Sequence, residues 1–401
     1  MKKISAFVLA ALLLLMAFSG MASAAAPAKP PITVWVGTQK IAFDAPPLIA
    51  NSTTYVEFKA LFKALGFEIA YDAKSKTITG ASNGVSLVLN AATGAASVNG
   101  QASAKPVKLI VKAGRTLVPL RYVGEATGMN VNWNAAARKI TISAKAPTAA
   151  EVKELQALLA QMDLVDSAGD LNGFLSFLVP NTPLYDAIKA QGAPKAGDPV
   201  VSTMSKLLDI QDFTPYSANV TVSQHAAKVS GGFYLDNDCV IQLGLQRGQD
   251  KHWKVRSIGL LQFDYVNTDN VLNHEADVPA EDKAAILAVI DKQAQASTDE
   301  DLDAYRATID PQAPNVDQSL ETVKQLFDVY DLKYTTEIAR IVDFTDNEAV
   351  IYVVQTIEKL KGPDYPNSRA FMAVTFRKTE DGQWIDEGTG KLIKVDPLPN
   401  V

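Results

Sequence analysis

The first third of the chain contains one pattern of residues twice, and this repeat limits what the chain can fold into. The segment Thr54–Lys59 recurs 62 positions later as Thr116–Arg121. The same spacing relates the following pairs: Gly66 and Gly128, Tyr71 and Trp133, Ile78 and Ile140. A fixed spacing indicates one supersecondary unit used twice. Such units build platforms and spacers more often than a single catalytic pocket, so the repeat constrains the fold and leaves the ligand open.

Each copy of the repeat is expected to contain extended segments, a short helix and a hairpin. Apolar residues from Phe58 to Leu65 have the i, i+3, i+4, i+7 spacing of one helix face. Gly66 and Gly128 are expected to end the two helices, because glycine adopts a left-handed backbone at little cost. The sequence therefore predicts a duplicated β-rich domain. It is expected at 32–145, with copies at about 32–95 and 96–145.

The start of the chain has the pattern of a secretory signal peptide. Lys2 and Lys3 precede an apolar run from Ile4 to Phe18, and Ala22-Ser23-Ala24 supplies the small residues of a cleavage site. The run is shorter than the ~20 residues that a membrane-spanning helix needs. We expect residues 1–24 to be removed, and the product to be secreted, extracellular and without a membrane anchor.

Charge and cysteine content narrow the partners and the source of stability. The formal net charge is −6, and removal of Lys2 and Lys3 makes it −8. An acidic chain argues against nucleic acid or anionic lipid as the main partner, because both require clustered lysine and arginine. Cys239 is the only cysteine, so no intramolecular disulfide can form. Stability must come from packed cores.

The second copy of the repeat carries a family motif. Gly114–Arg121 reads G-R-T-L-V-P-L-R, and it is followed by A-T-G at Ala126–Gly128 and by Trp133-Asn134. This phrase resembles the stalk domain named after the N-terminal domain of bacterial copper amine oxidases. The resemblance implies a structural role for its motif residues, which are Arg115, Pro119, Arg121, Gly128 and Trp133. The first copy departs from the motif, with Glu57 in place of proline and Lys59 in place of arginine.

The oxidase itself is not expected here. Copper chemistry of that type needs three imidazoles at one metal and a tyrosine that matures into a quinone cofactor. The chain has only His225, His252 and His274, and their wide spacing matches no local ligand pattern. We expect ordinary histidines, no metal site, no cofactor and no copper amine oxidase activity.

From Pro147 onward, the sequence changes to helices followed by long strands, in two copies. Thr148 and Glu151 form a capping-box pattern before an apolar helical stripe. Landmarks such as Trp253 and Trp384 recur at a spacing of 131. One further segment of the first copy, 206–213, aligns by its residues with 325–332 at a spacing of 119, which predicts a twelve-residue insertion in the first copy near 191–197.

This α+β plan of three helices and four strands resembles the nuclear transport factor 2-like, or SnoaL-like, superfamily. The resemblance covers 149–270 and 278–397 and implies a curved antiparallel sheet that closes on three helices as a cone. In the second copy both faces of the strand at Ala349–Val354 are apolar. A strand covered on one face would alternate, so we expect the sister domain to cover the outer face, by intrachain pairing of the two sheets.

Three groups of residues invite a chemical reading, and each also has a structural one. Asp299, Glu300, Asp301 and Asp303 could supply a catalytic carboxylate, but they stand at a predicted helix start, where acids cap the helix. Asp236 and Asp238 could bind calcium, but no loop glycine or distal glutamate accompanies them. Cys239 has no nearby cation to activate it. In each case we favour the structural interpretation, and we expect no catalytic residue.

The aromatic residues at equivalent places in the repeats, Tyr71 and Trp133 in the front and Trp253 and Trp384 in the back, are expected to pack in cores. The sequence thus favours an exported, non-enzymatic envelope or extracellular protein with a stalk platform and two binding or assembly domains. Its partner would be a cell-wall glycan or another envelope protein. The alternative is an isomerase-type or cyclase-type enzyme that uses one cone, which would show an inward-facing acid beside a tyrosine or histidine in an apolar cavity.

Overall fold

The computed structural model describes residues 30–82, 84–248, 250–273 and 275–399. The predicted signal peptide, residues 1–24, and His274 lie outside the described residues. The chain divides after Lys145 into two compact units. Helices and strands come in separate runs along the chain, and most strand pairs are antiparallel, so the expected α+β class is confirmed. Within the described part of the chain, no helix has both the length and the apolar character needed to cross a bilayer.

The first unit is built from short strands and two short helices. Its strands are β1 (Thr33–Val36), β2 (Gln39–Lys40), β3 (Leu48–Ala50), β4 (Thr53–Glu57), β5 (Glu68–Asp72), β6 (Thr77–Ser82), β7 (Val85–Asn90), β8 (Ala96–Val98), β9 (Gln101–Ala102), β10 (Ile110–Lys112), β11 (Arg115–Pro119), β12 (Asn130–Asn134) and β13 (Lys139–Ser143). Its helices are α2 (Phe58–Ala64) and α3 (Leu120–Ala126). Five elements of the first copy begin 62 residues before an element of the second copy. The pairs are β3 and β10, β4 and β11, α2 and α3, β5 and β12, and β6 and β13.

The two copies meet at a local twofold axis in the central sheet, whose order is β10-β11-β4-β3. Strands β4 and β11 pair antiparallel, with Val56 opposite Val118 and Tyr55 opposite Pro119. Because Val118 lies 62 residues after Val56, this pair sits on the axis. Both valines are fully buried. The duplication seen in the sequence is therefore a duplication in space.

Each helix of the first unit ends as the glycine pattern predicts. Gly66 follows α2 with φ +75°, and Gly128 follows α3 with φ +81°. A side chain at either position would strain the backbone, because a positive φ is costly for residues with a Cβ. Phe58, Leu61 and Phe62 of α2 are buried, which confirms the apolar face predicted for this helix.

The second unit contains two α+β domains joined by α7 (Thr268–Val271). The first α+β domain consists of α4 (Ala149–Ser167), α5 (Leu171–Ser176), α6 (Pro183–Gln191), β14 (Val200–Gln211), β15 (Ser217–Ser230), β16 (Asn237–Arg247) and β17 (Trp253–Tyr265). The second α+β domain consists of α8 (Ala280–Thr298), α9 (Leu302–Arg306), α10 (Val316–Val329), β18 (Asp331–Phe344), β19 (Glu348–Lys361), β20 (Ser368–Lys378), β21 (Trp384–Asp386) and β22 (Lys391–Pro397).

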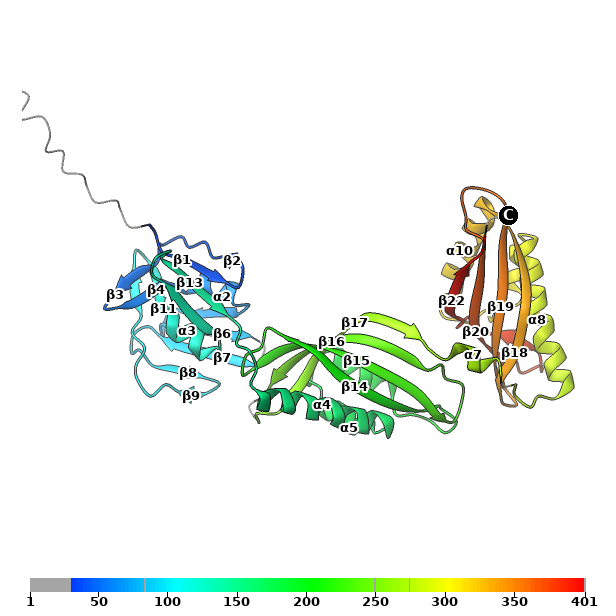
Figure 1. Ribbon diagram of the computed structural model, residues 1–401, viewed down its shortest axis with the longest axis horizontal. Helices are drawn as coiled ribbons and strands as arrows, with labels where there is room; N and C mark the ends of the chain where they lie inside the picture. The colour runs from blue at the N-terminus through cyan, green and yellow to red at the C-terminus, as the bar shows by residue number, and fades with distance from the viewer. Residues whose placement is uncertain (1–29, 83, 249, 274, 400–401) are drawn as a thin grey trace, which may run out of the picture. The chain divides into compact units, whose positions relative to one another are not determined.

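Each α+β domain packs a long helix against an antiparallel sheet (Figure 1). Helix α4 contacts β14 in the first domain, and α8 contacts β18 in the second. Thr148 and Glu151 form the predicted capping box at the start of α4. The core of the first domain joins Leu155 and Met162 of α4 to Trp253 and Val255 of β17. These contacts fix the helices over one face of the sheet.

The two α+β domains correspond at one constant spacing. Strands β14, β15, β16 and β17 begin 131 residues before β18, β19, β20 and β21, respectively. The alignment of 206–213 with 325–332 was therefore wrong, because 206–211 lies in β14 whereas 325–329 lies in helix α10. No twelve-residue insertion separates the described residues of the two copies. The similar letters arose from two amphipathic segments of different secondary structure.

Strand β19 is buried on both faces, as its apolar pattern suggests. Ile351 and Val353 belong to the core under α8, whereas Tyr352 and Val354 belong to a second cluster on the opposite face. That second cluster includes Phe233 from the loop between β15 and β16, together with linker residues. The first domain thus reaches this face through a loop, and face-to-face pairing of the two sheets stays a prediction.

Candidate functional site

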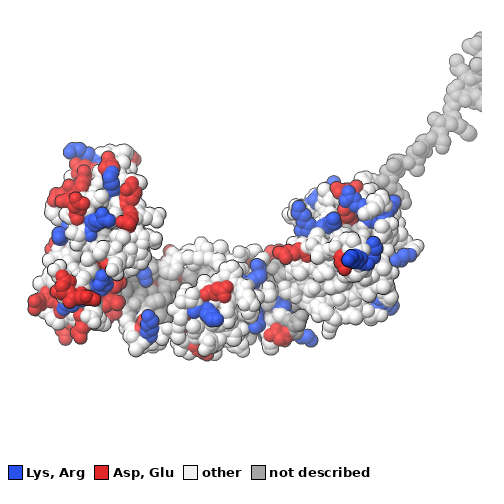
Figure 2. Space-filling view, turned by 180° about the vertical axis from the view of Figure 1, so that it is seen from behind, with Lys and Arg blue, Asp and Glu red and all other residues white. Residues whose placement is uncertain are grey.

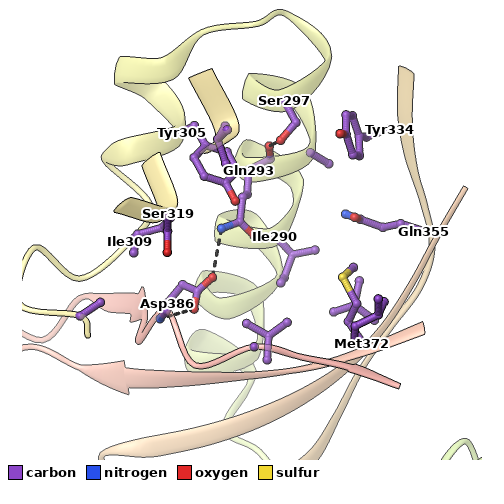
Figure 3. A pocket seen from close by; sticks show the side chains of 18 of the residues that line it. Ile290, Gln293, Ser297, Tyr305, Ile309, Ser319, Tyr334, Gln355, Met372 and Asp386 are labelled. Atoms are coloured by element: carbon purple, nitrogen blue, oxygen red, sulfur yellow. Dashed lines mark hydrogen bonds between the residues drawn. The ribbon is translucent and has the colours of Figure 1, made fainter. Parts of the chain in front are cut away.

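The second α+β domain contains a cavity of about 440 Å³ between its helices and its sheet. Helices α8, α9 and α10 supply one side of the lining, and strands β19 and β20 supply another. Much of the wall is apolar, with Ile290, Ile309 and Met372 among the lining residues. Figure 3 shows these side chains around a hollow, together with polar side chains such as Gln293 and Asp386. A volume of this size is in the range of small-molecule sites, ~300–1,000 Å³.

Asp386 is the buried acid of this cavity. It is the last residue of β21 and only 6% exposed. Its Oδ2 accepts a hydrogen bond from Gln293 Nε2 at 3.0 Å, and its Oδ1 accepts one from the backbone N–H of Gly388 at 2.8 Å. The backbone of Asp386 pairs with Thr308 and Asp310 on the helix side. The carboxylate is therefore held in one place by both helix α8 and the chain after β21.

The chain after Asp386 leaves the sheet for a short segment, and part of this segment lines the cavity. Strand β21 ends at Asp386, and β22 begins only at Lys391. Gly388 has φ +68°, and a Cβ there would approach the Cβ of Ala313 to 2.8 Å. Gly388 and Gly390 line the cavity. Glycine at 388 lets the backbone turn close to the helices while leaving room in the hollow.

Burial changes the acidity of two groups in the cavity. Burial raises the pKa of the Asp386 carboxyl, and the hydrogen bonds from Gln293 and Gly388 oppose this rise. Burial, assisted by the negative charge of Asp386, raises the pKa of Tyr305 to about 12. The Tyr305 hydroxyl consequently stays protonated near neutral pH and can donate a hydrogen bond to a bound molecule.

Other polar side chains complete the lining. Tyr334 and Gln355 stand across the hollow from Tyr305, as Figure 3 shows. Burial raises the pKa of Tyr334, so it too remains a donor. Gln355 donates through Nε2 to Thr336 Oγ1 at 3.2 Å. The site therefore combines an acceptor carboxylate, two phenolic donors and an apolar wall.

The first α+β domain fills the equivalent space. At the spacing of 131, Gln293 corresponds to Met162 and Asp386 corresponds to Val255. Both counterparts are buried in the apolar core. Phe174 stands at the position of Tyr305 and packs on the same core. The hollow that remains has a volume of about 180 Å³. The substitutions thus replace the anchors Gln293, Tyr305 and Asp386 by apolar residues, whereas Gln224, the counterpart of Gln355, and Asp163 still line the smaller hollow.

Sequence reasoning did not single out Asp386 or Gln293, and it expected no buried acid beside a proton donor in either domain. The second domain holds such a pair of residues in Asp386 and Tyr305. One signal was present: Asp386 stands where the first copy has Val255, two residues after a tryptophan that both copies share. A polar residue that replaces a core valine between two copies is a recognisable mark of a site.

Most of the residues that the sequence did single out have structural roles. Asp301 caps α9, because its Oδ1 accepts from Ala304 N at 2.9 Å; the capping interpretation is confirmed there. Cys239 is half-buried, and burial raises the pKa of its thiol. Trp253 and Trp384 are buried core residues as expected.

The remaining polar candidates lie apart from the cavity. His225 of β15 and Asp238 of β16 are exposed and contact each other at 2.7 Å across the two strands, whereas Asp236 accepts hydrogen bonds from Lys228 and Asn267. Their side chains have separate partners. Among the described residues, no three histidine, cysteine, aspartate or glutamate side chains form a group that could hold a metal ion.

The motif residues of the first unit are divided between a buried and an exposed set. Pro119 is buried at the start of α3, and Arg115 binds Glu57 at 2.7 Å and Asp44 at 2.9 Å. Arg121 and Trp133 are exposed, with Arg121 lying 3.6 Å from Glu125. Arg115 thus links the two copies, because Glu57 stands at the position of Pro119.

Solved structures with weak overall similarity cover single parts of the chain. One is a protein of unknown function with a cystatin-like fold from Nostoc punctiforme, which is 19% identical, covers 30% of this chain and 96% of its own, and has a TM-score of 0.27. Another is an NTF2-like protein involved in plasmid conjugation, which is 10% identical, covers 61% and 96%, and has a TM-score of 0.21. No curated protein matches this chain.

Two family matches cover separate segments. Residues 288–398 match the C-terminal domain of the anti-sigma-I factor RsgI9. This range includes every residue that lines the cavity. Residues 35–142, which contain both copies of the repeat, match the copper amine oxidase N-terminal domain, as the motif around Arg121 indicates.

Proposed function

We propose that this protein is an exported, non-enzymatic component of the cell envelope or extracellular space, whose second α+β domain binds a small molecule. The duplicated N-terminal domain is the platform, and the first α+β domain is a packed structural neighbour. One observation carries the proposal: the second domain keeps a hollow of about 440 Å³ around Asp386, where the first domain has a packed valine.

The chemistry of the cavity favours a neutral or cationic ligand with hydrogen-bond donors and an apolar face. Asp386 can accept a hydrogen bond, and an anionic ligand beside a buried carboxylate would be repelled. Tyr305 and Tyr334 offer donors to a ligand oxygen. Apolar contact with Ile290 and Met372 would supply much of the binding energy, at about 25 cal/mol per Å² of buried apolar surface.

The partners remain those that the sequence suggests, a cell-wall glycan or another envelope protein, with the two α+β domains paired within the chain. Contact of Phe233 with the outer face of the second sheet supports that pairing.

A transplant of the first domain's residues tests the proposal. Gln293→Met with Asp386→Val reproduces the Met162 and Val255 pair, so it removes the polar anchor with little change in the fold. Thermal unfolding would be measured with N-acetylglucosamine oligomers, muropeptide fragments and small amines. A compound that raises the Tm of the unaltered protein but not of this variant supports the proposal. Equal shifts in both proteins, or no shift with any of them, would count against it.

A second candidate function, proton-transfer catalysis, is favoured by the presence of Asp386 and Tyr305 in the same cavity. A buried carboxylate can act as a general base and a protonated tyrosine can polarise a carbonyl. The test is deuterium incorporation beside the carbonyl of cyclic ketones in heavy water, followed by NMR. Catalysed exchange that Asp386→Asn abolishes would establish enzyme chemistry. Exchange at the rate of buffer alone would exclude it for these ketones.

A further inference from the structure

Two aromatic rings of the N-terminal unit lie on its surface instead of in its core. Tyr71 is 44% exposed and Trp133 is 40% exposed. The sequence analysis placed both in the core, and that expectation was wrong. The two rings occupy equivalent positions, 62 residues apart, in β5 and β12. An exposed ring that occurs twice under one local symmetry suggests a surface used for binding.

Each ring stands in a groove, and the two grooves are copies of each other. The Trp133 groove has a volume of about 320 Å³ and includes Arg121, Ile49 and Thr54. The Tyr71 groove has a volume of about 470 Å³ and includes their counterparts. These are Lys59, Val111 and Thr116. In both, the aromatic and the cation come from one copy of the repeat, and the aliphatic residue and the threonine come from the other.

The twofold axis explains this composite construction. Strands β4 and β11 cross the axis side by side, so the β3–β4 hairpin of the first copy lies next to the helix and hairpin of the second. The reverse holds for β10–β11. Neither copy could form a groove alone. Ile49 and Val111 at the groove edges are themselves exposed, at 47% and 67%.

The cation in each groove is available to a ligand. Arg121 is 62% exposed as a side chain, and its contact with Glu125 at 3.6 Å is a loose surface pair between adjacent helical turns. Such pairs contribute little and exchange partners readily. Lys59 is exposed on α2. Arg115 differs, because Glu57 and Asp44 already bind it.

The charge of the chain is strongly uneven, which the overall value of −6 conceals. Residues 30–145 contain 13 lysines and arginines against 5 aspartates and glutamates, a formal net charge of +8. Residues 146–401 contain 22 against 39, a formal net charge of −17. On the face drawn in Figure 2, lysine and arginine side chains predominate over the N-terminal unit, and acidic side chains gather on the second α+β domain. The N-terminal unit alone is thus suited to an anionic partner.

We propose that the two grooves bind an acidic glycan, with a sugar ring lying on Trp133 or Tyr71 and its carboxylate bound by Arg121 or Lys59. The apolar face of a pyranose ring covers an aromatic ring well, and a guanidinium binds a carboxylate in a bidentate manner. The Trp133 groove offers one ring and Arg121. The Tyr71 groove offers one exposed ring with Lys59 and Lys76, in addition to Arg115, which Glu57 and Asp44 already bind.

Nucleic acid fits these observations less well. Duplex DNA carries one charge for every ~1.7 Å, which demands a dense basic stripe. The grooves instead supply one or two exposed cations beside each exposed ring. This inference rests on the proposed function for the exported location and for a glycan as the partner, and it adds the site and the acidic character of that glycan; the cavity around Asp386 plays no part in it.

The experiment uses the full chain and hyaluronan octasaccharide, which has one carboxylate per disaccharide, with binding measured by calorimetry. The unaltered protein should bind, and added salt should weaken the binding. Trp133→Ala should lower the affinity about tenfold, equivalent to ~1.4 kcal/mol, and Trp133→Phe should restore most of it. Arg121→Gln should lower the affinity at low salt, whereas Lys108→Gln, which removes a charge outside both grooves, should have little effect.

Each other outcome overturns the inference. If Arg121→Gln and Lys108→Gln weaken binding equally, the attraction is general charge and not a groove. If single-stranded DNA of matched charge binds more tightly and Trp133→Ala weakens it, the grooves are nucleic-acid sites. If neutral chitin oligomers of the same length bind equally, no carboxylate is recognised. The Gln293→Met, Asp386→Val variant should bind hyaluronan normally, so failure here is distinct from failure of the proposed pocket.

Discussion

The two α+β domains share one fold and differ in how well they are filled: the first, here called the solid domain, leaves a hollow of only about 180 Å³, and the second, here called the hollow domain, leaves about 440 Å³. Their strands correspond at a constant spacing of 131 residues. In the first domain Met162 and Val255 meet in a packed core; in the second Gln293 donates a hydrogen bond to Asp386 beside a cavity of about 440 Å³. The comparison teaches that substitutions at a few corresponding positions separate a packed apolar core from a cavity with a buried acid.

The exchange is coordinated rather than random. A buried carboxylate without a partner is costly, so the appearance of Asp386 requires a donor, and Gln293 supplies it from the helix that faces it. The strand break at 387–390 adds a second donor, the N–H of Gly388. In the first domain β17 continues through the corresponding segment. The corresponding strand is therefore continuous in the first domain and interrupted beside the cavity in the second.

The largest expected effect comes from placing the acid in the solid domain. Val255→Asp buries a charge among apolar side chains, and we expect a loss of about 3–5 kcal/mol of unfolding free energy at neutral pH. Urea unfolding followed by circular dichroism would measure it. Adding Met162→Gln should recover about 1.5 kcal/mol, because a hydrogen bond to a charged group contributes that much. A fully tolerated Val255→Asp would show that the first domain already has room for a polar anchor.

The outer faces of the two sheets differ in the same systematic way. Tyr352 and Val354 are buried on the outer face of the second sheet, where the first has Thr221 and Ser223. Only the apolar outer face of the second sheet must be shielded from water, and Phe233 is one of the residues that pack against it. A Phe233 backbone N–H also donates to Asp343 Oδ2 at 2.6 Å.

Removal of this cover tests that difference with a smaller expected effect. Phe233→Ala should lower the unfolding free energy by about 1–2 kcal/mol, because the ring is half-buried against apolar side chains. The matched control is Asp364→Ala, at the corresponding and highly exposed loop position of the second domain, which should change stability by less than ~0.5 kcal/mol. Limited proteolysis of the linker provides a second readout. Equal stability of the two variants would mean that Phe233 does not cover the sheet.

Sequence patterns predicted the features that depend on local spacing. The 62-residue repeat, the glycine caps at Gly66 and Gly128 and the capping box at Thr148 all follow from short-range rules and are present in the structure. The exposure of Trp133 was missed, because Trp133 lies with Val131 on the one apolar face of an alternating strand, a pattern that predicts a covered face. Whether that face is covered depends on how the two copies meet at Val56 and Val118.

The cavity was missed for a related reason. Gln293 and Asp386 lie 93 residues apart, and only the packing of α8 against β21 brings them together. The alignment of 206–213 with 325–332 was wrong because it relied on residue types alone, and α10 and β14 share an apolar pattern over a few residues. A strict comparison at the spacing of 131 would have exposed Asp386 against Val255, because a core position that changes from valine to aspartate needs an explanation.

The smallest expected effect is a pH dependence that distinguishes the hollow domain from an ordinary acidic surface. Burial raises the pKa of Asp386 above its ordinary 3.8. A raised folded pKa means that the stabilising contribution of the protonated acid is present below 3.8 and is lost as the pH rises through the folded pKa. Asp386→Asn, which stays neutral, should therefore gain stability relative to the unaltered protein as the pH rises, by about 1.4 kcal/mol for each unit of the shift.

Asp310 is the matched control, since the hydrogen bond that it accepts from Arg377 lowers its pKa. Its contribution is present above 3.8 and is lost as the pH falls through the folded pKa, so Asp310→Asn should show the opposite slope in urea unfolding between pH 3 and 7. Parallel curves for the two variants would show that Asp386 is solvated like any surface acid, and the contrast between the solid and the hollow domain would then lie in shape alone.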